Sequence, residues 1–338
     1  MTQIRRGVLF GVVVFFSFLV GGIVQARPAV RISLPPMLES LPLAFASEWG
    51  IFEEYDVSVE LIGITDNQER SSALLTGNLD AILGDVTRSL LDISGGWDVV
   101  ITGAASSRPQ TGSLRVALLG HESFGIDSFD SLVSSGLMIG TNYRSDYEYL
   151  LDEVMIDHGS ADAWMSRYMY FNDMLQVAIW FGAETIPAAV LPEPYISYIA
   201  NYTLPSGRIP VIVTLSDFSS IEVPPVPIVF NRTFVRRNPD TVERFFAAYA
   251  AAIERLNATP REELIEVGID VVLSLFFQGA NKDTIPQESI DAITIPYFNP
   301  LTPLDRALFD LIGGWMKDKG YLRVVPEYDD AVDHRYLP

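Results

Sequence analysis

The stretch VRISLPPMLESLPLAFASEWGIFEEYDVSVELIGITDNQERSSALLTGNLDAILGDVTRSLLDIS, residues 30–94, decides the fold. It contains three short apolar runs that are typical of strands, Val30–Leu34, Val57–Ile62 and Ala81–Gly84. Each run ends in a loop that carries a carboxylate, and each loop leads into a helix-like segment. Open α/β sheets bind ligands in loops at the carboxyl ends of their strands. These loops hold no catalytic set, so the stretch predicts an α/β protein that holds a small molecule.

The same alternation continues to about residue 235 and predicts mainly parallel sheets. Further strands are expected at Val99–Thr102, Leu114–Leu118, Leu137–Thr141, Met169–Phe171, Ala188–Leu191 and Val211–Thr214. Helices are expected at Leu41–Trp49, Gln68–Thr76, Thr87–Ile93, Asp146–Asp157, Asp173–Phe181 and Pro194–Ala200. Beyond residue 235 only amphipathic helices are expected, at 239–257, 260–277, 286–293 and 302–319. Two sheet-bearing halves and a helical C-terminal tail predict a two-lobed protein.

The chain is expected to pass between the lobes twice, because lobes that close on a ligand are commonly joined by two crossings. One crossing is placed near Ala105–Ser113 and the return near Glu222–Pro227, whose proline-rich sequence is rigid and incompatible with a strand. An ordinary surface loop is the alternative for the second segment. The first lobe is then 27–108 plus 226–338, the second lobe is 109–225, and the ligand cleft lies between them.

Charge and composition exclude several classes of protein. The 338 residues carry a net charge of −20 with lysine only at Lys282, Lys317 and Lys319. Nucleic-acid binding is not expected, because phosphate binding needs clustered basic residues. The sequence has no cysteine, which rules out disulfides, thiolate metal sites, a cysteine nucleophile and lipid attachment to an N-terminal cysteine. No cofactor and no metal site are predicted.

The N-terminal segment Met1–Ala26 has the pattern of a secretory signal peptide. Arg5 and Arg6 form its charged region, an apolar run follows to Val24, and small residues precede the expected cleavage point. Arg5-Arg6 also fits a twin-arginine signal. The alternative is an uncleaved membrane anchor, since the apolar run is close to the minimum length of a spanning helix. A periplasmic location without lipid is therefore predicted.

Six segments together resemble a known family in their order and spacing. They are Pro42–Ala46 with Trp49–Phe52 and Val57–Glu60, Leu75–Ala81, Phe129–Leu132 with Leu137–Thr141, Phe181–Gly182 through Ile186–Val190 to Pro192–Pro194, Phe234–Pro239 with Val242–Ile253, and Trp315–Leu322. The chain resembles the bacterial solute-binding proteins of ABC importers for nitrate, sulfonates, taurine and thiamin pyrimidine precursors. It departs from that family at Leu132–Gly136, where Leu-x-Gly-Lys is degraded, and at Gly182–Pro187, where Gly-x-Val-Asp-Ala is replaced.

The resemblance implies a two-lobed periplasmic binding protein of type II, in which each lobe is a mixed, mainly parallel sheet flanked by helices. It also implies capture of a small molecule by lobe closure and delivery to a membrane permease with its cytoplasmic ATPase. A monomer is expected, with contact to the membrane only through the permease or an uncleaved N-terminal segment.

The predicted ligand contacts lie in loops that face one cleft in this picture. They are Glu39, Ser40, Asp66, Asn67, Asp85, Val86 and Thr87 from the first lobe, and Thr141, Asn142, Tyr143, Arg144, Tyr147, Glu193 and Tyr195 from the second. Carboxylates are poor neighbours for a sulfonate or nitrate and strong acceptors for N–H groups, and tyrosines stack on flat rings. An aromatic nitrogen heterocycle, such as a thiamin pyrimidine precursor or a flavin, is therefore the expected ligand.

Several of these residues have structural alternatives. Asp66 and Asp85 each precede a helix and are candidates for N-caps, and Glu39 is a candidate for a solvated loop acid. Arg144 either pairs with Asp146 or Glu148, or holds an anionic group of the ligand. Glu193, between two prolines, either contacts the ligand or plays a structural role in its loop.

Three other functions compete with transport of a heterocycle. A binding protein for sulfonate, taurine or nitrate is the first, and a ligand-sensing module that uses the same lobes is the second. The third is an enzyme of the pyrimidine-precursor type on the same fold. The enzyme is disfavoured because His121, His158 and His334 are far apart in the sequence, and the chain has no cysteine and no Gly-x-Ser-x-Gly motif.

Overall fold

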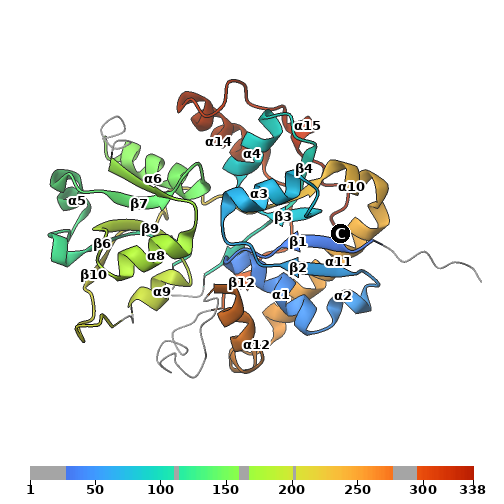
Figure 1. The fold of residues 1–338 in the computed structure, drawn as a ribbon, viewed down its shortest axis with the longest axis horizontal. Coiled ribbons are helices and arrows are strands. Elements are labelled where there is room, and N and C mark those ends of the chain that lie inside the picture. Colours follow the sequence, from blue (N-terminus) through green and yellow to red (C-terminus); the bar gives the residue numbers. More distant parts are fainter. Residues whose placement is uncertain (1–27, 110–113, 160–166, 201–202, 277–294) are drawn as a thin grey trace, which may run out of the picture.

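The computed structural model describes residues 28–109, 114–159, 167–200, 203–276 and 295–338. These residues form two lobes that lie side by side, each built on its own sheet (Figure 1). The expected signal peptide at 1–26 and the expected helix at 286–293 lie outside the described residues. Within the described ranges, no helix is both long enough and apolar enough to span a bilayer.

The first lobe is built on a sheet with the strand order β2-β1-β3-β11-β4. Its strands are β1 (Val30–Ser33), β2 (Val59–Ile62), β3 (Ala81–Leu83), β4 (Val99–Ala105) and β11 (Val226–Asn231). β1 pairs in parallel with β2 and β3, whereas β11 runs antiparallel to β3 and β4. β5 (Ser107–Arg108), which follows β4 in the chain, pairs with β12 (Tyr297–Phe298) in a short antiparallel ribbon.

The second lobe is built on a sheet with the order β10-β6-β9-β7-β8. Its strands are β6 (Val116–His121), β7 (Ile139–Asn142), β8 (Tyr168–Phe171), β9 (Ala188–Pro192) and β10 (Ile212–Ser216). β7 pairs in parallel with β8 and β9, and β6 runs antiparallel to β9 and β10. The two sheets thus share one plan, in which a single strand opposes the direction of the others.

Helices cover both sheets (Figure 1). Those of the first lobe are η1 (Leu38–Ser40), α1 (Leu41–Glu48), α2 (Ile51–Glu54), α3 (Asn67–Leu75), α4 (Val86–Ser94), α10 (Arg232–Arg237), α11 (Pro239–Ala258), α12 (Arg261–Phe276), α14 (Arg306–Asp318) and α15 (Tyr328–Ala331). Those of the second lobe are η2 (Glu122–Phe124), α5 (Phe129–Ser135), α6 (Asp146–Asp157), α8 (Met174–Gly182) and α9 (Tyr195–Ala200). In the C-terminal region, α14 packs against α4.

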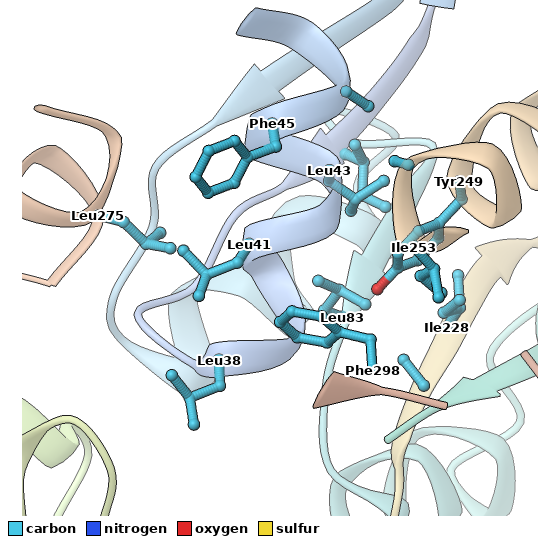
Figure 2. Close-up of a cluster of buried hydrophobic side chains, with 14 of the residues drawn as sticks. Leu38, Leu41, Leu43, Phe45, Leu83, Ile228, Tyr249, Ile253, Leu275 and Phe298 are labelled. Carbon is cyan, nitrogen blue, oxygen red and sulfur yellow. The ribbon is translucent and has the colours of Figure 1, made fainter. Parts of the chain in front are cut away.

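The core of the first lobe positions the loop that follows β1. Leu43 of α1 lies on the side of Tyr249 and Ile253 of α11, whereas Leu41 and Phe45 lie on the side of α1 that faces Leu275 of α12 (Figure 2). The hydroxyl of the buried Tyr249 on α11 donates a hydrogen bond of 2.7 Å to the carbonyl oxygen of Glu39. Because α11 comes from the C-terminal part of the chain, a distant helix holds η1 in place and aims Glu39 toward the second lobe.

The structure confirms the two-lobed α/β fold with mixed sheets and a helical C-terminal region. The prediction that Glu222–Pro227 is incompatible with a strand was wrong at its end, because β11 begins at Val226 and includes Pro227. Pro227 is tolerated there because only its carbonyl is needed, which accepts a hydrogen bond from the Gly84 N–H. The exact lobe boundaries, 27–108 with 226–338 and 109–225, stay a prediction.

Candidate functional site

Two adjoining cavities, both open to solvent, lie between the lobes. Both are lined by Met37 and Asp85 of the first lobe and by Tyr147 of the second. The larger cavity continues to Glu39, Glu193 and the return crossing at 223–226, and the smaller one continues to Arg70 and Asn142. Because the two cavities share walls and draw on both lobes, together they form one cleft between the lobes.

Glu39 is buried at the edge of the larger cavity and has two partners. Its Oε1 accepts hydrogen bonds from the Ser107 hydroxyl at 2.9 Å and from Arg115 Nη2 at 3.3 Å. Arg115 also donates to the carbonyl oxygen of Pro224 in the return crossing. The alternative of a solvated loop acid is therefore wrong for Glu39, whose carboxylate instead connects η1 to both crossings between the lobes.

Asp85 lines both cavities, and its pKa is raised strongly. Burial and the neighbouring Asp146 carboxylate raise the pKa of Asp85 to about 7, against the opposing effects of Arg70 and a hydrogen bond from Asn67. Asn67 Nδ2 donates that bond over 3.0 Å. Asp85 precedes α4, but its side chain makes no capping hydrogen bond, so the N-cap alternative is wrong here. Its carboxyl group faces the cleft and is partly protonated near neutral pH.

The smaller cavity is rich in hydrogen-bonding groups. Arg70 donates to the carbonyl oxygens of Ile64 and Thr65 and to Asn67 Oδ1. Among the described residues, Arg70 Nε and Asn142 Oδ1 have no hydrogen-bond partner, although these residues are only 2% and 1% exposed. Buried polar atoms normally find a partner. Two residues that line this cavity therefore carry one donor and one acceptor without a partner in the described chain.

Glu193 lines the larger cavity from the second lobe. It follows β9 and is joined to Pro194 by a cis peptide bond. Its carboxylate accepts hydrogen bonds from the Ser197 N–H at 3.0 Å and the Ser197 hydroxyl at 2.8 Å. Burial raises the pKa of Glu193, and the two bonds from Ser197 act against that rise. Glu193 thus holds the first turn of α9 and borders the cavity at the same time.

The structure places several predicted contacts outside the cavity walls. Asp66 caps α3 by accepting from the Glu69 N–H, which confirms the N-cap alternative. Ser40 donates to the Pro35 carbonyl, and Thr141 lies buried in β7. Tyr195 packs edge-on against Phe276 in the core.

Tyr143 and Arg144 lie on a different surface, next to the C-terminal helix. The Arg144 guanidinium stacks 4.9 Å from the ring centres of both Tyr143 and Tyr321, and the Arg144 N–H donates to Glu148. Tyr147 is therefore the single tyrosine, of the three proposed for ring stacking, that lines the cavities of the described chain. Burial raises its pKa above the ordinary tyrosine value.

Val86 and Thr87 belong to the site because their backbone N–H groups donate hydrogen bonds to the Asp146 carboxylate of the second lobe. Sequence reasoning did not select Asp146, Arg70 or Arg115. One available signal for Asp146 was its place at the start of a helix that follows a strand-end loop. Arg70 lies one turn into α3 and Arg115 next to the crossing, where no local pattern distinguishes them from surface arginines.

Residues 38–263, more than half of the chain, match the family model described as NMT1/THI5 like. No curated protein matches the sequence significantly. A ligand-binding component of an ABC-type import system from Staphylococcus aureus, solved with zinc bound, superimposes with a TM-score of 0.68 at 12% identity, covering 92% of this chain and 98% of its own.

Two further structures extend the comparison. The alkanesulfonate-binding protein of Xanthomonas axonopodis pv. citri, bound to MOPS, gives a TM-score of 0.63 at 14% identity and covers 93% and 99% of the two chains. The periplasmic nitrate-binding protein of Synechocystis PCC 6803 gives 0.66 at 12% identity and covers 90% and 84%. These likenesses show that the fold is that of periplasmic binding proteins. On the match of the family model, the chain belongs to the NMT1/THI5-like family.

Proposed function

We propose that this protein is the extracytoplasmic solute-binding component of an ABC importer. The observation that carries the proposal is the cleft between the lobes, which draws its walls from both sheets and from the return crossing. A ligand that touches both lobes stabilises the closed arrangement, because it binds that arrangement more tightly than the open one. The signal peptide, the periplasmic location and delivery to a permease with its ATPase belong to the same proposal.

The ligand that suits the smaller cavity is a small nitrogen heterocycle with adjacent donor and acceptor groups. Asn142 Oδ1 accepts from such a ring, Arg70 Nε donates to it, and Asp85 accepts from it or donates to it according to its protonation. Tyr147 lines the same cavity, and a tyrosine ring is suited to stacking on a flat ligand. A thiamin pyrimidine precursor has this pattern, and a flavin has it on one edge of a larger ring system.

Capture without chemistry fits the cleft better than catalysis. None of the three histidines lines either cavity. Glu39 and Glu193 are engaged by Arg115 and Ser197, which leaves Asp85 as the acid with a strongly shifted pKa and few partners. Within the described ranges, no group of three histidine, aspartate or glutamate side chains is arranged to hold a metal ion.

A thermal-shift screen of the purified mature protein tests the proposal. We expect stabilisation by aminopyrimidines or flavins at 1:1 stoichiometry, because a ligand at about 100 times its Kd adds about 2.7 kcal/mol to the free energy of unfolding. Sulfonates, taurine and nitrate are screened in parallel. Stabilisation by the small anions alone would contradict the heterocycle.

The Asn142→Ala variant tests the contact itself. We expect it to weaken binding of the heterocycle roughly tenfold in an isothermal titration, the effect of losing about one buried hydrogen bond. Asn78→Ala makes the same chemical change on the exposed surface of the first lobe and should leave the affinity unchanged. Equal affinities of the wild type and Asn142→Ala would remove Asn142 from the site.

A further inference from the structure

The Asp146 carboxylate reaches from the second lobe to the start of a helix in the first. Asp146 is the first residue of α6, and its Oδ2 accepts from the Val86 N–H at 2.9 Å. Its Oδ1 accepts from the Thr87 N–H at 2.9 Å and from the Thr87 hydroxyl at 2.6 Å. All three donors belong to the first turn of α4, so one buried side chain joins the lobes inside the cleft.

The start of α4 is a place where a negative charge is stabilised. The first N–H groups of a helix have no partner within the helix, and the helix dipole gives that end a partial positive charge. In many proteins these groups bind an anion. Here the two N–H groups and the threonine hydroxyl are taken by a carboxylate of the chain itself. Asp85, which directly precedes the helix, does not use its side chain for this purpose.

A second observation indicates where a ligand binds instead. Asp146 lines the larger cavity, whereas the unpartnered Arg70 Nε and Asn142 Oδ1 belong to residues that line the smaller one. Both of these residues are more than nine-tenths buried. The Arg70 Nε–H group needs an acceptor and Asn142 Oδ1 needs a donor. A neutral or cationic ring provides both.

We infer that Asp146 determines the specificity of the cleft by occupying the position at α4 that the anionic group of a ligand would take. The inference rests on the proposed solute-binding function. An anion that enters the cleft must displace Asp146 and then lies beside two carboxylates, Asp146 and Asp85, so its binding is disfavoured. A neutral or cationic solute leaves the Asp146 contact intact and gains from lobes that are already joined there.

The test compares four proteins by isothermal titration with methanesulfonate and with nitrate. They are the wild type, Asp146→Ala, Asp146→Asn and the control Asp157→Ala, which removes an exposed carboxylate from the same helix. We expect Asp146→Ala to bind at least one of the two anions roughly tenfold or more tightly than the wild type, since it frees the three donors and removes a like charge. Asp146→Asn should gain less, because the amide still fills the space. The control should match the wild type.

The same proteins are titrated with the aminopyrimidine or flavin found in the screen. Binding of that ring by the wild type tests the proposed function, whatever the anions do. A gain of anion binding in Asp146→Ala without any binding of the ring would support the inference and contradict the heterocycle. If folded Asp146→Ala, checked by circular dichroism, gains no anion affinity, the inference is wrong. Tight anion binding by the wild type would overturn it as well.

Discussion

The Lys319→Met variant is expected to lose about 3–5 kcal/mol of its free energy of unfolding, the typical effect of breaking a buried ion pair by removing one partner. Lys319 follows α14, and its ammonium group forms ion pairs of 2.6 Å with Glu148 and with Asp152 of α6. The three side chains are 6%, 0% and 11% exposed. Without the lysine, two carboxylates remain buried near each other with no cation between them.

The surroundings of this ion cluster increase the expected effect. Tyr170 and Tyr321 donate to Glu148, while Tyr168 and Trp315 donate to Asp152. The carboxylates of Glu148 and Asp152 each accept more than one hydrogen bond from these donors. Such an arrangement suits ionised carboxylates. Trp315 and Tyr321 belong to the C-terminal region that packs on the first lobe, whereas the acids belong to the second. The cluster therefore joins the lobes outside the cleft, and its loss should favour their separation.

Urea unfolding monitored by tryptophan fluorescence measures the effect. Lys317→Met removes an exposed lysine from the same helix and should change the unfolding free energy by less than about 0.5 kcal/mol. Combining Lys319→Met with Glu148→Gln and Asp152→Asn should recover most of the loss, because the uncompensated charges are then gone. A single variant as stable as the wild type would show that the cluster contributes nothing.

The fold could be predicted from the sequence because its strands are short apolar runs between polar loops. β1, β3, β7 and β9 were placed to within a few residues, since all of them are buried in the interior of a sheet. β11 was missed because prolines precede and enter it. A strand that runs against its neighbours at the return crossing is a product of tertiary pairing, and no local pattern in 222–231 indicates it.

The cleft could be predicted in part, by the rule that ligands bind at strand ends. The rule located Glu39, Asn67, Asp85, Asn142, Tyr147 and Glu193 at the cavity walls. It failed for Tyr143 and Tyr195, because neighbouring residues of a loop point in different directions. Tyr195 faces Phe276 on α12, a contact that joins parts of the chain far apart in the sequence.

Most acids of the cleft have hydrogen-bond partners within the protein. The sequence alone therefore overstates how many of these carboxylates are available to a ligand. Glu39 is paired with Arg115, Asp146 binds the start of α4, and Glu193 binds Ser197. The contacts of Glu39 and Glu193 use acceptor capacity that the sequence assigned to the ligand, and Asp146 was not assigned to it at all. Asp85 is the exception, since its hydrogen bond comes from Asn67 and its charge is opposed by Asp146. Asp85 is thus the cleft acid whose charge is least compensated by hydrogen bonds from the protein.

The free energy of unfolding of the wild type is expected to fall as the pH rises, and the Asp85→Asn variant is expected not to show the part of this fall that is due to Asp85. The pKa of Asp85 is about 7 in the folded protein and about 4 in an unfolded chain. Below pH 4 both states hold the proton and the group makes no difference. Between pH 4 and 7 the unfolded state releases its proton while the folded state keeps it, so the free energy of unfolding falls and then levels off above pH 7.

The groups that face Asp85 set the size of this effect. Asp146 and Tyr147 of α6, Asn67 and Arg70 of α3, and Arg88 of α4 surround the carboxyl group, and burial outweighs the nearby arginines. The rise of the Asp85 pKa from about 4 to about 7 corresponds to about 4 kcal/mol between the two limits. The side-chain amide introduced by Asp85→Asn has a similar shape and still accepts from Asn67, but it does not titrate.

Urea unfolding at pH 5 and pH 8 decides the matter. The wild type should lose about 3 kcal/mol more than Asp85→Asn between these two pH values, since most of the titration of Asp85 lies in this range. Asp157→Asn neutralises an exposed carboxylate and should follow the wild type at both pH values. If Asp85→Asn follows the wild type too, the carboxyl group is ionised in the folded protein at pH 5. Its position between Asp146 and the cavities would then need a compensating cation, and Arg70, the arginine that lines the same cavity, is the group to replace next.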